Sequence, residues 1–250
     1  MTLDGKNVLV TAGSGKLGAE ICRAFAGAGA NVAVNFRSSA EEAHRLVDEL
    51  SSSHDGRHVA VRADVSVGEE VAQMVETVQS ELGVIDILVN NAGPFSRTHF
   101  VDLPATEWDS VIGSNLAATY ECSAAVAPGM RSSGWGRIVN VSAVSAWVRN
   151  RATYGLAKSS IHTLTESLAL ELGPEVTVNA VAPGQIAESL DEMSGIDEEW
   201  ANSVVSATPA GRLVTRGEVA DLVVALCGPL FDMVTGEVLA LDGGLRLPRF

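Results

Sequence analysis

The residues best suited to do chemistry are Tyr154 and Lys158, which stand four positions apart. In a helix, this spacing places the phenol and the ammonium on one face, where they can act together. A free tyrosine has a pKa of about 10 and exchanges protons poorly at neutral pH, whereas a nearby cation favours the phenolate and lowers that pKa. The pair therefore predicts a general acid–base site, although a Tyr-x-x-x-Lys spacing is also common by chance.

A glycine-rich stretch lies near the start of the chain, directly after a short apolar run. Its residues are Gly13, Ser14, Gly15, Lys16, Leu17 and Gly18, which is the pattern G-x-G-x-x-G. At a strand-to-helix turn, such glycines let the backbone approach a pyrophosphate, whose charge then meets the helix N-terminus. A turn that is only rich in glycine is the alternative. The position after a first strand favours a dinucleotide site.

The end of the expected second strand bears on the choice of dinucleotide. NAD-binding versions carry an acidic residue there for the ribose hydroxyls, but this chain reads Asn35-Phe36-Arg37-Ser38. The guanidinium of Arg37 suits a 2′-phosphate, and Lys16 offers a second positive charge. We therefore expect NADP(H) rather than NAD(H), with a solvated surface arginine as the alternative.

Short apolar runs alternate with longer amphipathic segments along the chain. Runs rich in valine and isoleucine predict seven strands, at 7–11, 31–36, 58–62, 85–90, 137–142, 176–181 and 238–241. Segments between them, including 17–28, 40–51, 69–82 and 154–172, show helical spacing of apolar residues. Nearly all-apolar strands are buried on both faces. The expected fold class is α/β: a Rossmann-like, doubly wound, seven-stranded, mostly parallel sheet with helices on both faces.

Length and composition fit one compact domain. The chain has 250 residues, of which 46% are apolar and 19% charged, so it can bury a core and differs from disordered chains. We expect a single dinucleotide-binding domain over 1–250. An acidic segment at 187–206 is expected to form a substrate lid over the carboxyl ends of the strands.

The net charge, the hydropathy and the spacing of cysteines and histidines argue against nucleic-acid, membrane and metal binding. A net charge of −14 repels phosphate backbones and anionic lipid, so we expect no nucleic-acid or membrane partner. No apolar run reaches the roughly 18 residues of a membrane helix, and no signal-peptide core is visible, which favours the cytoplasm. Cysteines and histidines lack metal-ligand or triad spacing, so we expect no metal site. The cysteines are Cys22, Cys122 and Cys227, and the histidines considered for such chemistry are His99 and His162, two of the five in the chain.

Further motifs stand in a fixed order along almost the whole chain. They are Thr11 to Gly18, Ala63-Asp64-Val65, Asn90-Asn91-Ala92-Gly93, Asn115, Arg137 to Ser142, Tyr154 with Lys158, Asn179 to Gly184 and Asp242-Gly243-Gly244. With these motifs the chain resembles the short-chain dehydrogenase/reductase family, especially its 3-oxoacyl-acyl-carrier-protein-reductase-like branch.

The resemblance implies a role for each matching site. Tyr154 would be the general acid in carbonyl reduction, Lys158 would bind the nicotinamide ribose and tune Tyr154, and Asn115 would hold a water that relays protons to Lys158. It also implies that Asp64 and Val65 border the adenine, that Asn90, Asn91, Ala92 and Gly93 flank the cofactor, and that Pro183, Gly184 and Ile186 lie beside the nicotinamide.

Two motifs depart from the family pattern. In the family turn T-G-x-x-x-G-x-G, the first glycine falls on Ala12 and the middle one on Lys16. After the Pro-Gly turn, where the family usually has threonine, this chain reads Glu188-Ser189, and Ser189 is a candidate substitute.

The serine that orients the substrate oxygen in the family has three candidate positions here. Counting from Arg137 places it at Ala143, whereas counting back from Tyr154 places it near Ser142, because the intervening loop is about two residues short of the family form. Ser145 is a third candidate. We favour Ser142, with the alternative that it merely ends a strand.

The sequence thus predicts an NADP(H)-dependent oxidoreductase that reduces a ketone, such as a 3-oxoacyl thioester or a secondary-metabolite carbonyl, to a secondary alcohol. The competing hypothesis is a non-catalytic or weakly active dinucleotide-binding regulatory protein, motivated by Lys16, Ala143 and Glu188. The intact Tyr154 and Lys158 favour the enzyme. The resemblance also implies a homotetramer or homodimer.

Overall fold

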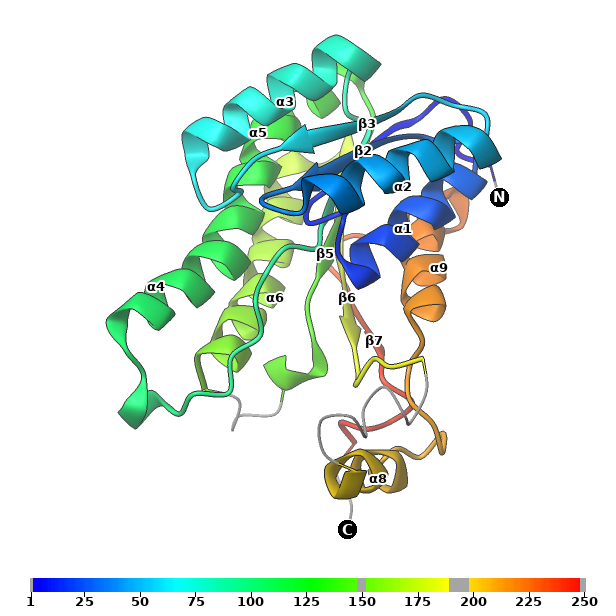
Figure 1. Cartoon of the computed structure of the whole chain (residues 1–250). Helices are drawn as coiled ribbons and strands as arrows, with labels where there is room; N and C mark the ends of the chain where they lie inside the picture. Colours follow the sequence, from blue (N-terminus) through cyan, green and yellow to red (C-terminus); the bar gives the residue numbers. More distant parts are fainter. Residues whose placement is uncertain (1, 148–151, 189–197, 248–250) are drawn as a thin grey trace.

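The computed structural model describes residues 2–147, 152–188 and 198–247, and within them seven parallel strands form one sheet (Figure 1). The order across the sheet is β3-β2-β1-β4-β5-β6-β7. The strands are β1 (Asn7–Val10), β2 (Asn31–Phe36), β3 (His58–Arg62), β4 (Ile87–Asn90), β5 (Gly136–Val141), β6 (Val176–Pro183) and β7 (Val238–Leu241). The predicted α/β class and Rossmann-like sheet are confirmed, and every pairing between neighbouring strands is parallel.

Helices cover both faces of this sheet (Figure 1). One face carries α1 (Lys16–Gly27), α2 (Ala40–Ser53) and α9 (Arg216–Leu226), and the other carries α3 (Gly68–Leu82), α4 (Ala105–Ile112), α5 (Ala118–Ser133) and α6 (Ala152–Leu172). A further helix, α8 (Glu198–Ala207), lies beyond the carboxyl ends of β6 and β7.

The core has two halves because side chains alternate along each buried strand. In β1, Val8 and Val10 pack into the apolar cluster that contains α1 and α9, whereas Leu9 packs into the cluster that contains α3 and α5. All three side chains are fully buried. Burial on both faces explains why the strands are almost entirely apolar.

The expected element boundaries differ from the observed ones by a few residues. The fourth strand begins at Ile87 rather than at Ile85, and the carboxylate of Asp86, just before it, accepts hydrogen bonds from Lys6 and from the Asn7 amide at the edge of β1. Ser142 lies just beyond β5, and β6 extends two residues further than expected, to Pro183.

The strand order places the site at the carboxyl edge of the sheet. Strand β1 pairs with β2 on one side and with β4 on the other, so the strand order reverses at β1. In open α/β sheets, ligands bind beyond the carboxyl ends of the strands at such a point. The glycine-rich stretch, the segment after β4 and the segment after β5 all begin at this edge.

The expected lid at 187–206 lies partly outside the described residues. Its described parts are Ala187 and Glu188, which follow β6, and the first nine residues of α8. Ala187, Ala201 and Leu213 form a small apolar cluster that attaches α8 to the segment before α9. None of the helices among the described residues has the length and apolarity needed to cross a membrane.

Candidate active site

The glycine-rich turn after β1 is built from close backbone contacts. A Cβ atom at Gly18 would overlap the carbonyl oxygen of Ala12, and one at Gly13 would lie 3.0 Å from the Val10 carbonyl oxygen. Ala12, at the family's first glycine position, adopts a positive φ of 48°. Asn35 holds the turn, because its side-chain Oδ1 accepts a hydrogen bond from the Ala12 amide and its backbone carbonyl accepts one from Gly13.

The N-terminus of α1 faces this turn and is suited to an anion. Gly15 is the N-cap, no side chain caps the helix, and its first turn contains no acidic residue. The first amide groups of a helix carry partial positive charge and lack partners within the helix. With the close turn beside them, these groups fit a pyrophosphate, as the sequence predicts.

The ends of β1 and β4 are tied together by side chains. The hydroxyl oxygen of Thr11 accepts hydrogen bonds from the amides of Asn91 and Ala92, at 2.9 and 3.0 Å, and the Asn91 side chain donates to the Thr11 carbonyl. Gly93 follows with a φ of 147°, and a Cβ there would overlap the side chain of Asn115. The residues predicted to flank the cofactor therefore lie at the carboxyl ends of β1 and β4, beside the glycine-rich turn.

Arg37 lies at the end of β2, opposite the residues that follow β3. Its guanidinium is 3.6 Å from a carboxylate oxygen of Asp64, and about two thirds of its side chain is exposed. Hydrogen bonds from Ser66, together with Arg37, lower the pKa of Asp64. Arg62, which sequence reasoning missed, donates to the Arg37 carbonyl. Val65 is buried beside them.

Tyr154 and Lys158 lie on the first turns of α6, where Lys158 is buried and Tyr154 is half-buried. The Lys158 ammonium donates to the Val141 carbonyl at 2.8 Å and lies 5.6 Å from the centre of the Tyr154 ring. Phe95 meets that ring edge-on at 4.9 Å. The predicted proximity of phenol and ammonium is therefore present.

The pKa shift expected for the tyrosine was wrong in direction. Burial raises the pKa of Tyr154 to about 12, and burial lowers the pKa of Lys158 to about 8. Desolvation disfavours the charged form of each group, and this effect exceeds the attraction between phenolate and ammonium that the spacing suggested.

Asn115 lies in η2 (Gly113–Ala117), a π-helical turn between α4 and α5. Its side chain is fully buried, and its amide nitrogen donates to the carbonyls of Pro94 and Val111. The side-chain oxygen has no hydrogen-bond partner within the described structure. A buried carbonyl oxygen without a partner is suited to accept a hydrogen bond from water.

The two serine candidates differ in their partners. The Ser142 hydroxyl donates to the Lys158 carbonyl at 3.1 Å and lies 2.9 Å from Nε2 of His162. Ser145 belongs to η3 (Val144–Ala146), and its buried hydroxyl oxygen has no hydrogen-bond partner in the described structure. The third counted position, Ala143, has no hydroxyl. The structure thus pairs Ser142 with His162, a contact that sequence spacing did not reveal.

The segment after β6 runs along the same edge. Pro183 ends the strand, and a Cβ at Gly184 would lie 3.0 Å from Cα of Asp242. Ile186 forms a parallel bridge with Val214. Ser189, the candidate substitute for the family threonine, lies outside the described residues.

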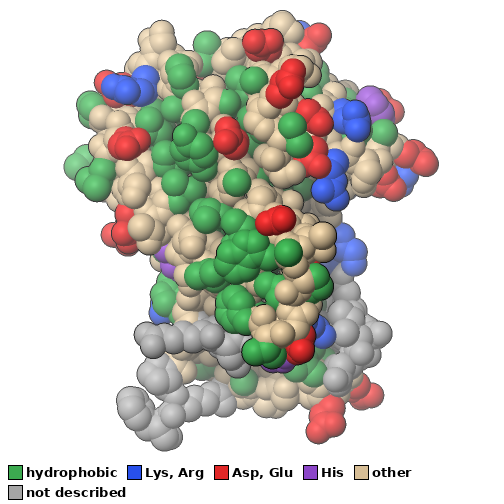
Figure 2. All heavy atoms as spheres, turned by 90° about the vertical axis from the view of Figure 1, so that its left-hand side faces the viewer, with side chains coloured by type: hydrophobic (Ala, Val, Ile, Leu, Met, Phe, Trp, Pro, Cys, Tyr) green, Lys and Arg blue, Asp and Glu red, His purple; other side chains and the backbone are tan. Residues whose placement is uncertain are grey.

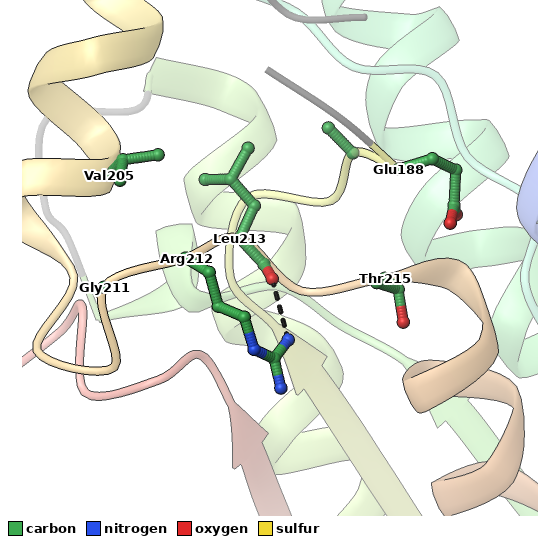
Figure 3. Close-up of a pocket in the computed structure, with 7 residues that line it drawn as sticks. Glu188, Val205, Gly211, Arg212, Leu213 and Thr215 are labelled. Atoms are coloured by element: carbon green, nitrogen blue, oxygen red, sulfur yellow. Dashed lines mark hydrogen bonds between the residues drawn. The ribbon is translucent and has the colours of Figure 1, made fainter.

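Glu188 is bound to the start of α9. Its carboxylate accepts hydrogen bonds from the amide and the guanidinium of Arg216, at 3.0 and 3.1 Å, at the start of α9. A small pocket opens beside this segment (Figure 3). Its lining residues are Ala187, Glu188, Val205, Gly211, Arg212, Leu213 and Thr215, so it lies apart from Tyr154 and Lys158.

Known proteins resemble the chain over nearly its full length. The family model described as enoyl-(acyl carrier protein) reductase matches residues 12–246. Nodulation protein G of Azospirillum brasilense is 36% identical, over 96% of this chain and 98% of that protein. The chain belongs to the short-chain dehydrogenase/reductase family. A 3-oxoacyl-acyl-carrier-protein reductase of Staphylococcus epidermidis is 32% identical, over 97% of this chain and 99% of the relative.

Solved structures of the family agree with the fold. A gluconate 5-dehydrogenase from Burkholderia cenocepacia, in complex with NADP and tartrate, superposes with a TM-score of 0.92 at 27% identity, covering 99% of this chain and 98% of the other. The family consists of oxidoreductases that bind a nicotinamide dinucleotide, and its members include enzymes that act on alcohol or ketone groups. The resemblance read from the motifs is therefore confirmed.

Proposed function

We propose that this protein is an NADP(H)-dependent oxidoreductase that reduces a ketone to a secondary alcohol, with Tyr154 as the general acid. The observation that carries the proposal is the pairing of the half-buried Tyr154 with the buried Lys158, whose ammonium lies 5.6 Å from the centre of the tyrosine ring. The pair stands at the same sheet edge as an uncapped, glycine-lined helix N-terminus. The bound dinucleotide supplies the hydride. The protein supplies the proton and the orientation.

The phenol is suited to give a proton in this direction. With a pKa raised to about 12, Tyr154 is protonated throughout the neutral range and hydrogen-bonds a substrate oxygen, whose basicity rises as hydride arrives. Lys158 then helps to return a proton to the phenol, because its own pKa of about 8 allows it to exchange protons near neutral pH. The unpartnered Oδ1 of Asn115 supports a water on the path between Lys158 and solvent.

The preference for NADP(H) rests on the end of β2. Arg37 replaces the acidic residue that would bind ribose hydroxyls, and Arg62 stands beside it across the β2–β3 pair. Asp64 partly neutralises Arg37 at 3.6 Å. A 2′-phosphate carries more charge than this carboxylate and offers more acceptor oxygens, so we expect it to attract Arg37 more strongly. The related gluconate 5-dehydrogenase structure contains NADP.

The remaining cofactor contacts follow from the same placement. We propose that the pyrophosphate lies over the turn from Gly13 to Gly18, including Ser14, Gly15, Lys16 and Leu17. The adenine would lie near Asp64 and Val65, and the nicotinamide half beside Asn91, Ala92, Gly93, Pro183, Gly184 and Ile186.

Titration with NADPH and NADH, followed by nicotinamide fluorescence, tests the cofactor assignment. We expect tighter binding of NADPH, and we expect Arg37→Ala to weaken NADPH binding about 10-fold while NADH binding changes little. Arg45→Ala is the matched control, since Arg45 is an exposed arginine on the outer side of α2. Equal affinity for both dinucleotides, unchanged in Arg37→Ala, would overturn the NADP(H) preference.

The substrate is proposed as a carbonyl class rather than as one compound. The related reductase of Staphylococcus epidermidis acts, by its name, on 3-oxoacyl groups on a carrier protein. A panel of 3-oxoacyl thioesters and free ketones, assayed by NADPH consumption, identifies the class. If NADPH binds but no member of the panel is reduced, the non-catalytic dinucleotide-binding protein becomes the better account.

A further inference from the structure

In the loop after β4, at residues 95–98, successive side chains point to opposite sides. The hydroxyls of Ser96 and Thr98 both donate to the carboxylate of Glu107 on α4, at 2.6 Å and at 2.8 and 3.0 Å. These hydrogen bonds hold one side of the loop against α4. In an extended segment the intervening residue, Arg97, then points to the other side, as Phe95 does.

On that other side, aromatic rings connect Arg97 to the catalytic tyrosine. Phe95 packs edge-on against Tyr154 with the ring centres 4.9 Å apart. The guanidinium carbon of Arg97 lies 5.6 Å from the centre of the Phe95 ring and 5.3 Å from that of Trp200 on α8. The separation between the guanidinium and the Tyr154 ring therefore cannot exceed the sum of the first two distances.

The charge of Arg97 is not neutralised by the described parts of the protein. No carboxylate among the described residues lies within ion-pair distance of the Arg97 guanidinium. The carboxylate of Glu107, on the other side of the loop, accepts hydrogen bonds from Ser96 and Thr98 instead. Two acidic residues, Glu198 and Glu199, precede Trp200 on α8 without an ion pair to Arg97. In a chain with a net charge of −14, an exposed cation held between two rings, one of which packs against Tyr154, is unusual.

We propose that Arg97 binds an anionic end of the substrate, and that the preferred substrates are oxo acids whose carboxylate lies a few carbons from the ketone. This inference rests on the function proposed above, because it uses Tyr154 as the group that meets the carbonyl oxygen. A guanidinium offers paired donors that match a carboxylate, and the flanking rings fix its plane. Phe95 lies between the two groups and contacts the carbon chain.

Steady-state kinetics with paired substrates tests this assignment. The probes are 3-oxobutanoate, 4-oxopentanoate and 5-oxohexanoate and their methyl esters, which keep the ketone and remove the charge. The variants are Arg97→Gln and Arg97→Lys, with Arg45→Gln on α2 as the control for loss of a remote positive charge. NADPH binding by fluorescence verifies that each variant retains the cofactor site.

We expect the wild type to favour at least one acid over its ester in kcat/KM. We expect Arg97→Gln to raise KM for that acid about 10-fold, with kcat and the ester kinetics little changed, and Arg97→Lys to restore part of the loss. Arg45→Gln should behave as the wild type. High salt should reduce the acid preference in the wild type.

Four results would overturn the inference. If the wild type reduces the esters as well as the acids, or if Arg97→Gln affects both classes equally, Arg97 only fastens α8 to the loop, and the proposed reductase function stands. If neither class is reduced while thioesters are, the substrate class is wrong but the function survives. If no ketone or thioester is reduced, the proposed function fails and the inference fails with it.

Discussion

Two neighbouring residues, Tyr154 and Lys158, have pKa values shifted in opposite directions by the same cause. Burial raises the pKa of the phenol to about 12 and lowers that of the ammonium to about 8. Both groups are therefore held in the uncharged form over a wider pH range than in water. This arrangement favours reduction, in which the phenol begins as a proton donor.

The burial of Lys158 has a consequence for stability. Because its pKa in the folded state is about 8, against 10.5 when unperturbed, the unfolded chain binds more protons between these values. The free energy of unfolding therefore rises with pH across that window, by about 3 kcal/mol for the whole shift. We expect Lys158→Met to be more stable than the wild type at pH 7, by about 2 kcal/mol after loss of the bond to Val141.

Urea denaturation at pH 7 and at pH 10 measures this difference. The advantage of Lys158→Met should shrink at the higher pH, while reductase activity is lost at both. A constant difference in unfolding free energy at the two pH values would show that Lys158 is not strained by its burial. Lys158→Arg, which keeps a charge at both pH values, is the matched control and should be less stable than the wild type.

The hydrogen-bond partners of Ser142 and Ser145 distinguish the two candidates for the serine that orients the substrate oxygen. Since the Ser145 hydroxyl is buried without a partner whereas Ser142 is bonded to Lys158 and His162, we expect Ser145→Ala to lower kcat/KM about 100-fold and Ser142→Ala to lower it less than about 10-fold. Circular dichroism melting verifies that both variants fold. The reverse order of losses would return the role to Ser142, as the sequence count from Tyr154 favoured.

Residue types and spacing predicted the pair of Tyr154 and Lys158, but not the burial that sets their pKa values. Tyr154 and Lys158 are visible because a four-residue spacing is local. The sign of the pKa shift was missed because burial depends on Val141 and Phe95, which come from distant segments. The role of Asn35 in holding the glycine-rich turn was also missed. A polar residue inside an apolar strand indicates a buried hydrogen-bond partner, which here is the Ala12 amide.

At the scale of elements, the turn between β1 and α1 depends most strongly on the glycine at position 18. A Cβ at Gly18 would overlap the Ala12 carbonyl, so Gly18→Ala must displace the turn. We expect this variant to lose more than about 2 kcal/mol of stability and to bind NADPH at least about 10-fold more weakly.

Gly27→Ala in the same helix is its control, because the added Cβ finds only a His54 ring atom at 3.8 Å. This variant should bind NADPH normally and be slightly more stable, since alanine is the better helix former. Equal NADPH affinity in Gly18→Ala and Gly27→Ala would contradict the placement of the pyrophosphate at this turn.

The order and type of the elements could be predicted from the sequence, because each strand is a short apolar run and the helices show apolar residues at helical spacing. Boundaries were less certain, since they depend on contacts between elements. Asp86 illustrates this point, because it lies just before β4 and its carboxylate accepts a hydrogen bond from the backbone of Asn7 in β1. The π-helical turn at Asn115 leaves no pattern in the sequence.

At the scale of the whole molecule, the face that carries α4, α5 and α6 exposes many apolar side chains (Figure 2). The exposed large residues on or beside these helices are Phe100, Val101, Trp108, Tyr120, Leu156 and Leu170. Contiguous exposed apolar surface commonly marks an interface. We expect a homodimer or homotetramer, and light scattering of the purified protein in NADPH-containing buffer measures the mass. A clean monomer of 26 kDa at micromolar concentration would remove this expectation.

The most direct test of the account is NADPH consumption by the wild type and by Tyr154→Phe on the ketone panel, with NADPH affinity measured in parallel. We expect the wild type to consume NADPH only when a ketone is present. Tyr154→Phe should bind NADPH with similar affinity and turn over at least about 100-fold more slowly. Undiminished turnover in Tyr154→Phe, or NADPH binding without turnover in the wild type, would contradict the assignment of Tyr154 as the proton donor of a reductase.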